Sequence, residues 1–150
     1  MINKILKGLR KQEHQYIAKA ISLIEDEEFL GEELLNNIES SPMKSIRIGI
    51  TGPPGSGKSS ITNQLIKKYR EENKSICALL VDPSSPFTQG AVLGDRIRMK
   101  GFDDDSKVFI RSIASRGSKG GLSKNIHYIS DLKHLYISNS YSLHTFDLFS

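Results

Sequence analysis

The sequence predicts an α/β fold in which a parallel sheet is flanked by helices, with a helical extension at the N-terminus. Three observations lead to this prediction. A β-branched stretch runs directly into a glycine-rich loop, a continuous apolar run follows, and apolar residues recur at helical spacing before and between these segments. A chain of 150 residues, of which 37% are hydrophobic, is long enough for one modest core, so we expect a single main domain.

Residues 1–42 are expected to form the helical extension. The chain begins with a basic, amphipathic stretch, and three isoleucines within residues 17–24 then recur at the i, i+4 and i+7 positions of one helix face. A second helix is expected over residues 31–38. The sequence Ser-Ser-Pro at residues 40–42 breaks this pattern and therefore indicates a linker.

Residues 43–125 are expected to form the main domain, with at least three parallel strands. The stretch SIRIGIT at residues 45–51 predicts the first strand, and a helix is expected over residues 59–72 with Asn73 as a possible cap. The second strand, SICALLVD, is a continuous apolar run of the kind that is buried on both faces of a parallel sheet. The remaining expected elements are a helix over residues 92–100 and a strand over residues 108–113.

The formal net charge of +4 is distributed unevenly along the chain. Residues 43–125 carry 15 basic and 7 acidic side chains, a formal charge of +8, whereas residues 1–42 carry −3 and residues 126–150 carry −1. The middle segment is therefore expected to bind an anion. Because few aromatic residues accompany this charge, we expect no nucleic acid and favour a small polyanion.

The glycine-rich loop matches the pattern G-x-x-x-x-G-K-[ST], with Gly52, Gly57, Lys58 and Ser59 at the constrained positions. A loop of this kind between a strand and a helix surrounds a phosphate with backbone N–H groups, and the positive end of the helix dipole adds to the attraction. The alternative is a simple Gly-Pro turn between the two elements. The flanking strand and helix favour a P-loop that binds a nucleoside triphosphate.

The residue types in the loop indicate which of them would contact the nucleotide and Mg²⁺. Its two prolines have no N–H to donate, so the donors are expected from residue 55 onward. Lys58 is expected to reach the β- and γ-phosphates and is the catalytic candidate, while the Ser59 hydroxyl is expected to hold Mg²⁺. The residues expected to bind the nucleotide are Gly55, Ser56, Gly57, Lys58, Ser59 and Ser60.

Two further carboxylates are candidate metal ligands. Asp82 ends the apolar strand, at the sheet edge where open α/β folds bind ligands, and could face Mg²⁺. An Asp before Pro is also a common turn opener, so both interpretations of Asp82 remain open. Asp95 could serve the same metal, or it could be a solvated helix residue. The acidic run of residues 103–105 is interpreted as a surface turn.

These motifs resemble the methylmalonyl-CoA mutase-associated GTPases of the ArgK/MeaB type. The resemblance covers about residues 7–124. It is carried by the helical lead KGLRKQEHQYIAKAISLIED and by the blocks GITGPPGSGKSSI, VDPSSPFTQGAVLGDRIRM and FIRSIASRGSKGGLS. It implies a P-loop GTPase that binds GTP or GDP with Mg²⁺ and acts as a chaperone for a cobalamin-dependent acyl-CoA mutase, where it gates cofactor loading.

The resemblance also implies roles for individual positions of this sequence. Residues 55–60 would bind phosphate, and Ser59, Asp82 and Asp95 would lie around the metal. Residues 111–121 would form a switch segment. These roles follow from analogy with the family and not from spacing or composition.

The sequence departs from the family pattern after residue 124. The family's E-T-x-G-x-G segment, its N-K-x-D guanine-reading loop and its C-terminal dimerisation arm have no counterpart in residues 126–150. We therefore interpret these residues as a divergent or truncated tail, and we expect weak base selectivity and slow or absent hydrolysis. The histidines of the tail have no cysteine partner there, so no zinc site is expected.

Two alternative functions remain open from the sequence. One is a P-loop kinase of a small metabolite, although no acceptor-binding lid is recognisable. The other is a nucleotide-binding fragment that does not hydrolyse its ligand. The sequence has no apolar run long enough to span a membrane, no secretory signal and a single cysteine, Cys77, so we expect a cytoplasmic protein without a membrane partner.

Overall fold

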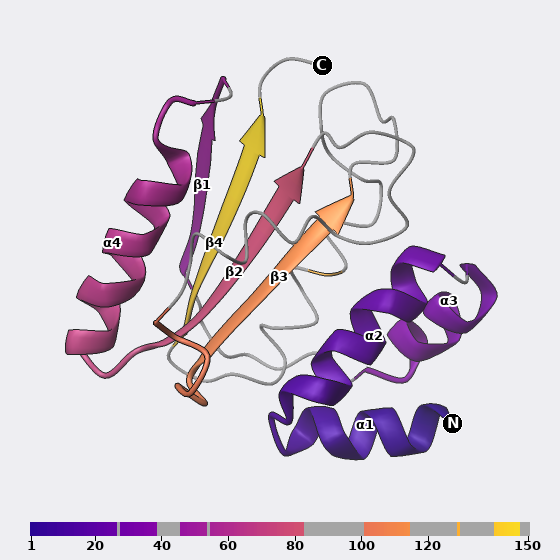
Figure 1. Cartoon of the computed structure of the whole chain (residues 1–150). Coiled ribbons are helices and arrows are strands. Elements are labelled where there is room, and N and C mark those ends of the chain that lie inside the picture. The colour runs from indigo at the N-terminus through magenta and orange to yellow at the C-terminus, as the bar shows by residue number, and fades with distance from the viewer. Residues whose placement is uncertain are drawn as a thin grey trace. The chain divides into compact units, whose positions relative to one another are not determined.

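The computed structural model of the chain contains helices α1 to α4 and strands β1 to β4 (Figure 1). Among the residues that it describes, no helix is both long and apolar enough to cross a membrane. The described residues are 1–26, 28–38, 46–53, 55–82, 101–114, 129 and 140–147.

Contacts between residues divide the chain into two units. The first comprises Met1–Ser45 and Asn125–Asn139, and the second comprises Ile46–Lys124 and Ser140–Ser150. The second unit contains the loop and the strands on which the candidate site depends. The three-part division expected from the sequence stays a prediction.

The first unit contains the helices α1 (Ile2–Arg10), α2 (His14–Asp26) and α3 (Glu28–Asn36). Two of them, α2 and α3, were expected, although α3 begins and ends earlier than residues 31–38. The amphipathic start of the chain was not predicted to form a helix of its own. The signal for α1 was nevertheless present, because three buried residues follow helical spacing: Ile2, Ile5 and Leu9.

The second unit contains a sheet of four parallel strands in the order β1-β4-β2-β3 (Figure 1). All four carboxyl ends therefore lie at one edge of the sheet. Ligands bind at this edge in open α/β sheets. The strands are β1 (Ile46–Gly52), β2 (Ser75–Asp82), β3 (Val108–Ala114) and β4 (Ser140–Asp147).

The predicted α/β class and the prediction of at least three parallel strands are confirmed. β2 has the predicted bounds, while β1 and β3 each end one residue later than predicted. The helix after the loop, α4 (Lys58–Glu71), begins one residue earlier than predicted. Shifts of this size are normal at element ends. The helix expected over residues 92–100 lies outside the described residues.

β4 was not expected, because residues 126–150 were interpreted as a divergent tail. Central parallel strands are usually continuous apolar runs, since both of their faces are covered. The sequence of β4, SYSLHTFD, contains serines, a histidine and an aspartate, so its composition did not indicate such a strand. Its hydrogen-bonded pairing with β1 on one side and β2 on the other nevertheless makes it a central strand of the sheet.

β2 is buried along its whole apolar run. From Ile76 to Val81 no side chain is more than 5% exposed. Side chains alternate between the faces of a strand, so both faces of β2 are covered. This confirms the interpretation of the continuous apolar run, and it places the thiol of Cys77 inside the fold.

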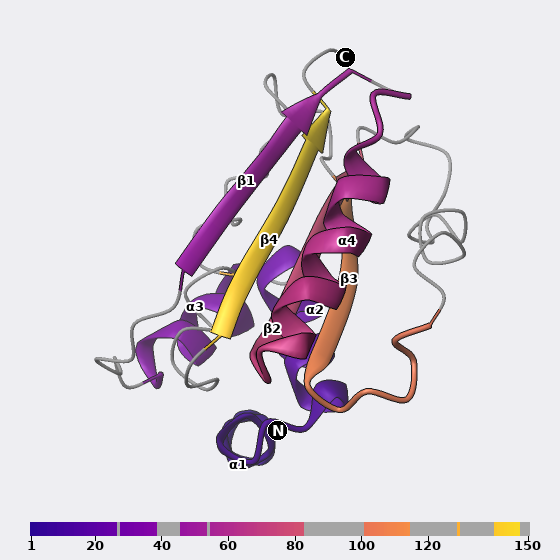
Figure 2. The same cartoon turned by 90° about the vertical axis from the view of Figure 1, so that its left-hand side faces the viewer.

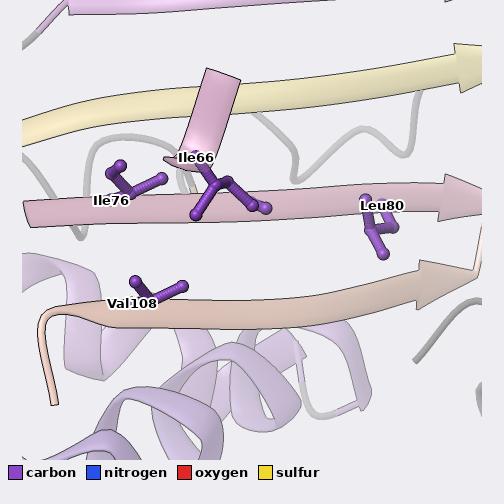
Figure 3. Close-up of a cluster of buried hydrophobic side chains, with 5 residues drawn as sticks. Ile66, Ile76, Leu80 and Val108 are labelled. Carbon is purple, nitrogen blue, oxygen red and sulfur yellow. The ribbon is translucent and has the colours of Figure 1, made fainter. Parts of the chain in front are cut away.

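Helix α4 lies along one face of the sheet (Figure 2). Its Ile66 is fully buried against Ile76, Leu80 and Val108 of the strands (Figure 3). Burying a side chain of this size stabilises the fold by about 1.5–3 kcal/mol. The helix is thereby held on the sheet with its N-terminus at the carboxyl edge. The other members of the cluster are Ala78 and the partly buried Ile48, Leu65, Tyr69, Phe102 and Ile110.

The C-terminal end of α4 is joined to the turn that precedes β3. The Nε atom of Arg70 donates to a carboxylate oxygen of Asp105 at 2.6 Å, and the Nζ atom of Lys107 donates to Oδ1 of Asn73 at 2.7 Å. Asn73, predicted as a possible cap, follows the helix in the left-handed conformation with φ 58°. The helix is therefore anchored by polar contacts at this end and by the apolar cluster along its length.

Candidate functional site

The glycine-rich loop connects the carboxyl end of β1 to the first turn of α4. Gly55 and Gly57 have φ values of 78° and 89°, in the left-handed region that side chains disfavour. A Cβ atom at either position would have no heavy atom within 4 Å. Glycine is therefore required at these two positions by the positive φ of the backbone, and not by a lack of space for a side chain.

Gly52 has a different role at the end of β1. A Cβ atom here would lie 2.7 Å from the Ser56 hydroxyl oxygen, so the absence of a side chain lets the loop fold back closely over the strand. The N–H of Ser56 donates to the carbonyl of Pro53 at 3.2 Å, which closes a turn inside the loop. The loop is thus a compact structure whose shape is set by three glycines.

The first turn of α4 presents backbone N–H groups at the loop. Gly57 is the N-cap, and the N–H of Ile61 makes the first helical bond back to it at 3.0 Å. The N–H groups of the first helical turn have no acceptor within the helix, and the dipole makes this end positive. Ser59 and Ser60 lie in this turn. The arrangement can bind an anion such as a phosphate group.

Lys58 reaches back from the start of α4 across the loop. Its ammonium group donates to the carbonyl oxygens of Gly52 and Pro53, each at 2.9 Å. The backbone carbonyl of Lys58 in turn accepts a bond from the buried Thr62 hydroxyl at 2.8 Å, which fixes the first turn. A positive charge is therefore held beside the N-terminus of α4, where it adds to the field of the helix.

The sheet places one predicted metal ligand at the same edge. Asp82 is the last residue of β2, at the carboxyl edge where the loop lies. Together with the half-buried Ser59 it would offer oxygen ligands, which are the type that Mg²⁺ prefers. The chemistry of these two positions fits the metal. Asp95 lies outside the described residues. The roles of the predicted site residues stay predictions.

The predicted switch segment is only partly described. Its first residues, 111–114, belong to β3, and Arg111 lies opposite Leu79 in the register of the sheet. The rest of the segment, residues 115–121, is outside the described residues. The acidic run predicted as a surface turn does precede β3, with Asp103 and Asp104 both exposed.

The comparisons with known proteins agree with one another. The family model of the methylmalonyl-CoA mutase-associated GTPase MeaB matches residues 17–133. A Pyrococcus horikoshii protein, named provisionally as a GTPase, is 46% identical over 123 residues, which are 82% of this chain and 39% of that protein. The GTPase ArgK of Escherichia coli is 34% identical over 123 residues, covering 79% of this chain and 37% of the relative.

A solved structure has the same fold. The crystal structure titled LAO/AO transport system kinase matches with a TM-score of 0.69 at 20% identity, over 97% of this chain and 43% of that one. At this identity the likeness shows the fold alone, and it supports the predicted P-loop class. This chain spans less than half the length of each of these proteins. The family match and the two relatives show that the chain belongs to the MeaB family of methylmalonyl-CoA mutase-associated GTPases.

Proposed function

We propose that the chain binds GTP or GDP together with Mg²⁺ on the loop at the start of α4. The observation that carries this proposal is the loop itself. Two left-handed glycines turn the backbone around a helix N-terminus, with the ammonium group of Lys58 beside it, in a chain that belongs to a GTPase family. The helix N-terminus and the lysine are both positive, as a bound polyphosphate requires.

Different residues of the chain would contact different parts of the nucleotide and its metal ion. The N–H groups of residues 55–60 would surround the phosphate oxygens. Lys58 would exchange its bonds to the carbonyls of Gly52 and Pro53 for bonds to the β- and γ-phosphates. Ser59, Asp82 and Asp95 would hold Mg²⁺, which would neutralise charge on the bound phosphates.

The proposed biological role is that of a chaperone for a cobalamin-dependent acyl-CoA mutase in the cytoplasm. The support is the description of the family as mutase-associated GTPases. Nucleotide binding would then control an interaction with the mutase and the loading of its cofactor. The alternative of a small-metabolite kinase gains no support from the family match or from the relatives named as GTPases.

The central claim is tested by titrating the purified chain with fluorescent GDP and fluorescent GTP in the presence of Mg²⁺. We expect saturable binding that unlabelled GTP displaces. Failure of GTP to displace the probe would contradict the proposal. Phosphate release measured at saturating GTP then distinguishes a GTPase from a fragment that binds without hydrolysis. Adding a cobalamin-dependent acyl-CoA mutase and measuring GDP dissociation tests the proposed partner.

A further inference from the structure

The two strands at the edges of the sheet differ in how far they are covered. Among the described residues, β1 pairs only with β4, and β3 pairs only with β2. In β3, no residue from Val108 to Ile113 is exposed. In β1, four of the seven residues are exposed, namely Ile46, Arg47, Gly49 and Thr51. The more open edge of the sheet is therefore that of β1.

The face of β1 on the side of α4 is also only partly covered. Helix α4 lies over β2 and leaves β1 at its side (Figure 2). Ile46, Ile48 and Ile50 share one face of the strand, and Ile48 packs against the cluster beneath α4. Ile46 is nevertheless 54% exposed, and the other two isoleucines are half-buried. An apolar row therefore remains partly in solvent beside the open edge.

This edge lacks the features that usually keep an edge strand from pairing. An edge strand directs every second N–H and C=O group away from its partner, and proteins protect such edges with prolines, bulges or several charged side chains. The sequence of β1, IRIGITG, has no proline and a single charged residue, Arg47. Its register with β4 runs through all seven residues without a bulge. The edge is therefore suited to pairing with a strand of another molecule.

The sequence of β1 is complementary to itself in one antiparallel register. Centred on Gly49, this register gives all seven residues a partner. Side chains at directly opposite positions lie on the same face, so the isoleucines of two copies form one continuous apolar row. A register centred on Arg47 would instead place two like charges opposite each other, which destabilises a sheet. The pairs in the favoured register are Gly49 with Gly49, Ile48 with Ile50, Arg47 with Thr51, and Ile46 with Gly52.

We infer that two copies of the chain associate through the open edges of β1, as an antiparallel pair about a two-fold axis at Gly49. The two four-stranded sheets then form one continuous sheet, with both α4 helices on the same face. Backbone hydrogen bonds between the two strands hold the pair together, and burial of the isoleucine row adds to its stability. The inference does not depend on nucleotide binding.

Sedimentation equilibrium of the purified chain without nucleotide tests the association. We expect the mass to rise reversibly with concentration from 16.7 kDa to twice that value. A mass of one chain at every concentration would overturn the inference. An open-ended series of larger oligomers would overturn it as well, because a two-fold pair is closed.

The register is tested by changing the charge of Thr51, which faces Arg47 of the other copy. Thr51→Lys should weaken dimerisation about 2- to 30-fold, because each dimer would contain two such pairs of like charges, and Thr51→Glu should strengthen it by a similar factor. Within one copy the two residues lie about 13 Å apart along the strand, so they cannot form an ion pair there.

The matched control is Asp104→Asn, which makes the same change in net charge as Thr51→Lys at an exposed position before β3. It should dimerise as the wild type does. Weaker dimerisation in both Thr51 variants, or no change in either, would exclude this register and overturn the inference.

Amide hydrogen exchange locates the interface in the wild type without a substitution. Exchange in β1 should slow as the protein concentration is raised, because the outward N–H groups become bonded in the dimer. Exchange in β3, at the other edge, should be the same at all concentrations. A dimer in which exchange in β1 did not slow would use another surface, and the inference would be wrong.

Discussion

The two ends of α4 use their polar groups differently. At the C-terminal end, Arg70, Asp105 and Lys107 bond to one another and to the backbone, with Arg70 also donating to the carbonyl of Lys74 at 2.8 Å. At the N-terminal end, glycines shape the backbone, and the helix presents first-turn N–H groups that have no acceptor within the helix. The polar side chains at the C-terminal end bond to one another, whereas the N-terminal end has first-turn N–H groups that the proposed ligand could use.

This difference indicates what each end contributes. Polar groups that satisfy one another fix the helix on the sheet, so their loss should reduce stability and leave ligand binding unchanged. The left-handed glycines and the lysine of the loop would set the geometry of the proposed anion site, so their substitution should weaken ligand binding, whether or not it also changes stability. Ligand affinity should therefore respond to substitutions at the N-terminal end of α4 and not to those at its C-terminal end, and the following predictions test this separation.

The largest effect is expected from Lys58→Ala. Hydrogen bonds to charged groups contribute about 1.5–3 kcal/mol, so losing the ammonium group should weaken GTP binding about 10- to 150-fold. The matched control is Lys68→Ala on the same helix, where an exposed lysine lies 3.7 Å from Glu71. Calorimetric titration with GTP should separate the two variants. Equal losses of affinity would contradict the assignment of the loop.

The next effect is expected from Gly57→Ala. A side chain at φ 89° is disfavoured by about 1–2 kcal/mol, so the loop should leave its binding geometry and lose about tenfold in affinity for GDP. Gly101→Ala is a matched control, because Gly101 also has a positive φ, 116°, but lies in the turn before β3. Urea unfolding should show a loss of stability in both variants. If Gly57→Ala and Gly101→Ala lowered the GDP affinity equally, the loss of affinity would come from reduced stability and not from the geometry of the loop.

A smaller effect is expected from Asp105→Asn at the other end of α4. Removing the carboxylate should lower the free energy of unfolding by about 1 kcal/mol at neutral pH, since the ion pair with Arg70 is partly exposed. GDP affinity should not change. Asp104→Asn, at the exposed neighbouring position, should leave both quantities unchanged. A weakened GDP affinity in Asp105→Asn would mean that the two ends of α4 are coupled.

The same carboxylate makes stability depend on pH in a defined direction. Burial alone raises the pKa of Asp105, but hydrogen bonds from Arg70 and from the Lys107 N–H, with the charges of both residues, lower the pKa below its ordinary value. A depressed pKa stabilises the fold above the unfolded-state pKa of about 3.9. The advantage of the wild type over Asp105→Asn should therefore hold at pH 5–7 and fade below about pH 4. If the difference in free energy of unfolding between the wild type and Asp105→Asn stayed constant from pH 7 to below pH 4, the Asp105 carboxylate could not be the source of that difference.

The sequence predicted the parts of the fold that have strong local signals. The apolar run predicted the first and last residues of β2, and the glycine pattern predicted the loop between β1 and α4. Both predictions were possible because these signals depend only on residues that are neighbours in the sequence. The loop residues expected to bind the nucleotide, 55–60, were predicted in the same way, and their role stays a prediction. Residue-level geometry such as the reach of Lys58 to the carbonyls of Gly52 and Pro53 required the structure.

β4 could not be predicted, for a physical reason. The strand forms through pairing with β1 and β2, which are far from it in the sequence, and its own mixed composition does not favour a buried strand. The position of Asp147 beside Gly52 is likewise a consequence of register, which local sequence does not specify. Long-range pairing therefore determines the part of the sheet that sequence patterns could not supply.

The smallest difference is expected between nucleotide bases. The N-terminal end of α4 would contact phosphate, which is the same in GDP and ADP, so this end of the helix should not distinguish the two nucleotides. Discrimination needs groups that bond to the base edge, such as a carboxylate that accepts from the guanine N1–H and 2-amino groups. The sequence has no N-K-x-D segment to place one.

We therefore expect the 150-residue chain to bind GDP and ADP within about tenfold of each other, a difference of at most ~1.4 kcal/mol. Competition of unlabelled GDP and ADP against one fluorescent nucleotide measures this ratio directly. Lys58→Ala should weaken both nucleotides by the same factor, because it acts on their shared phosphates. A strong preference for GDP would contradict this prediction, because it would require groups on this chain that bond to the guanine base. If Lys58→Ala weakened GDP and ADP binding by different factors, the N-terminal end of α4 would take part in base selection.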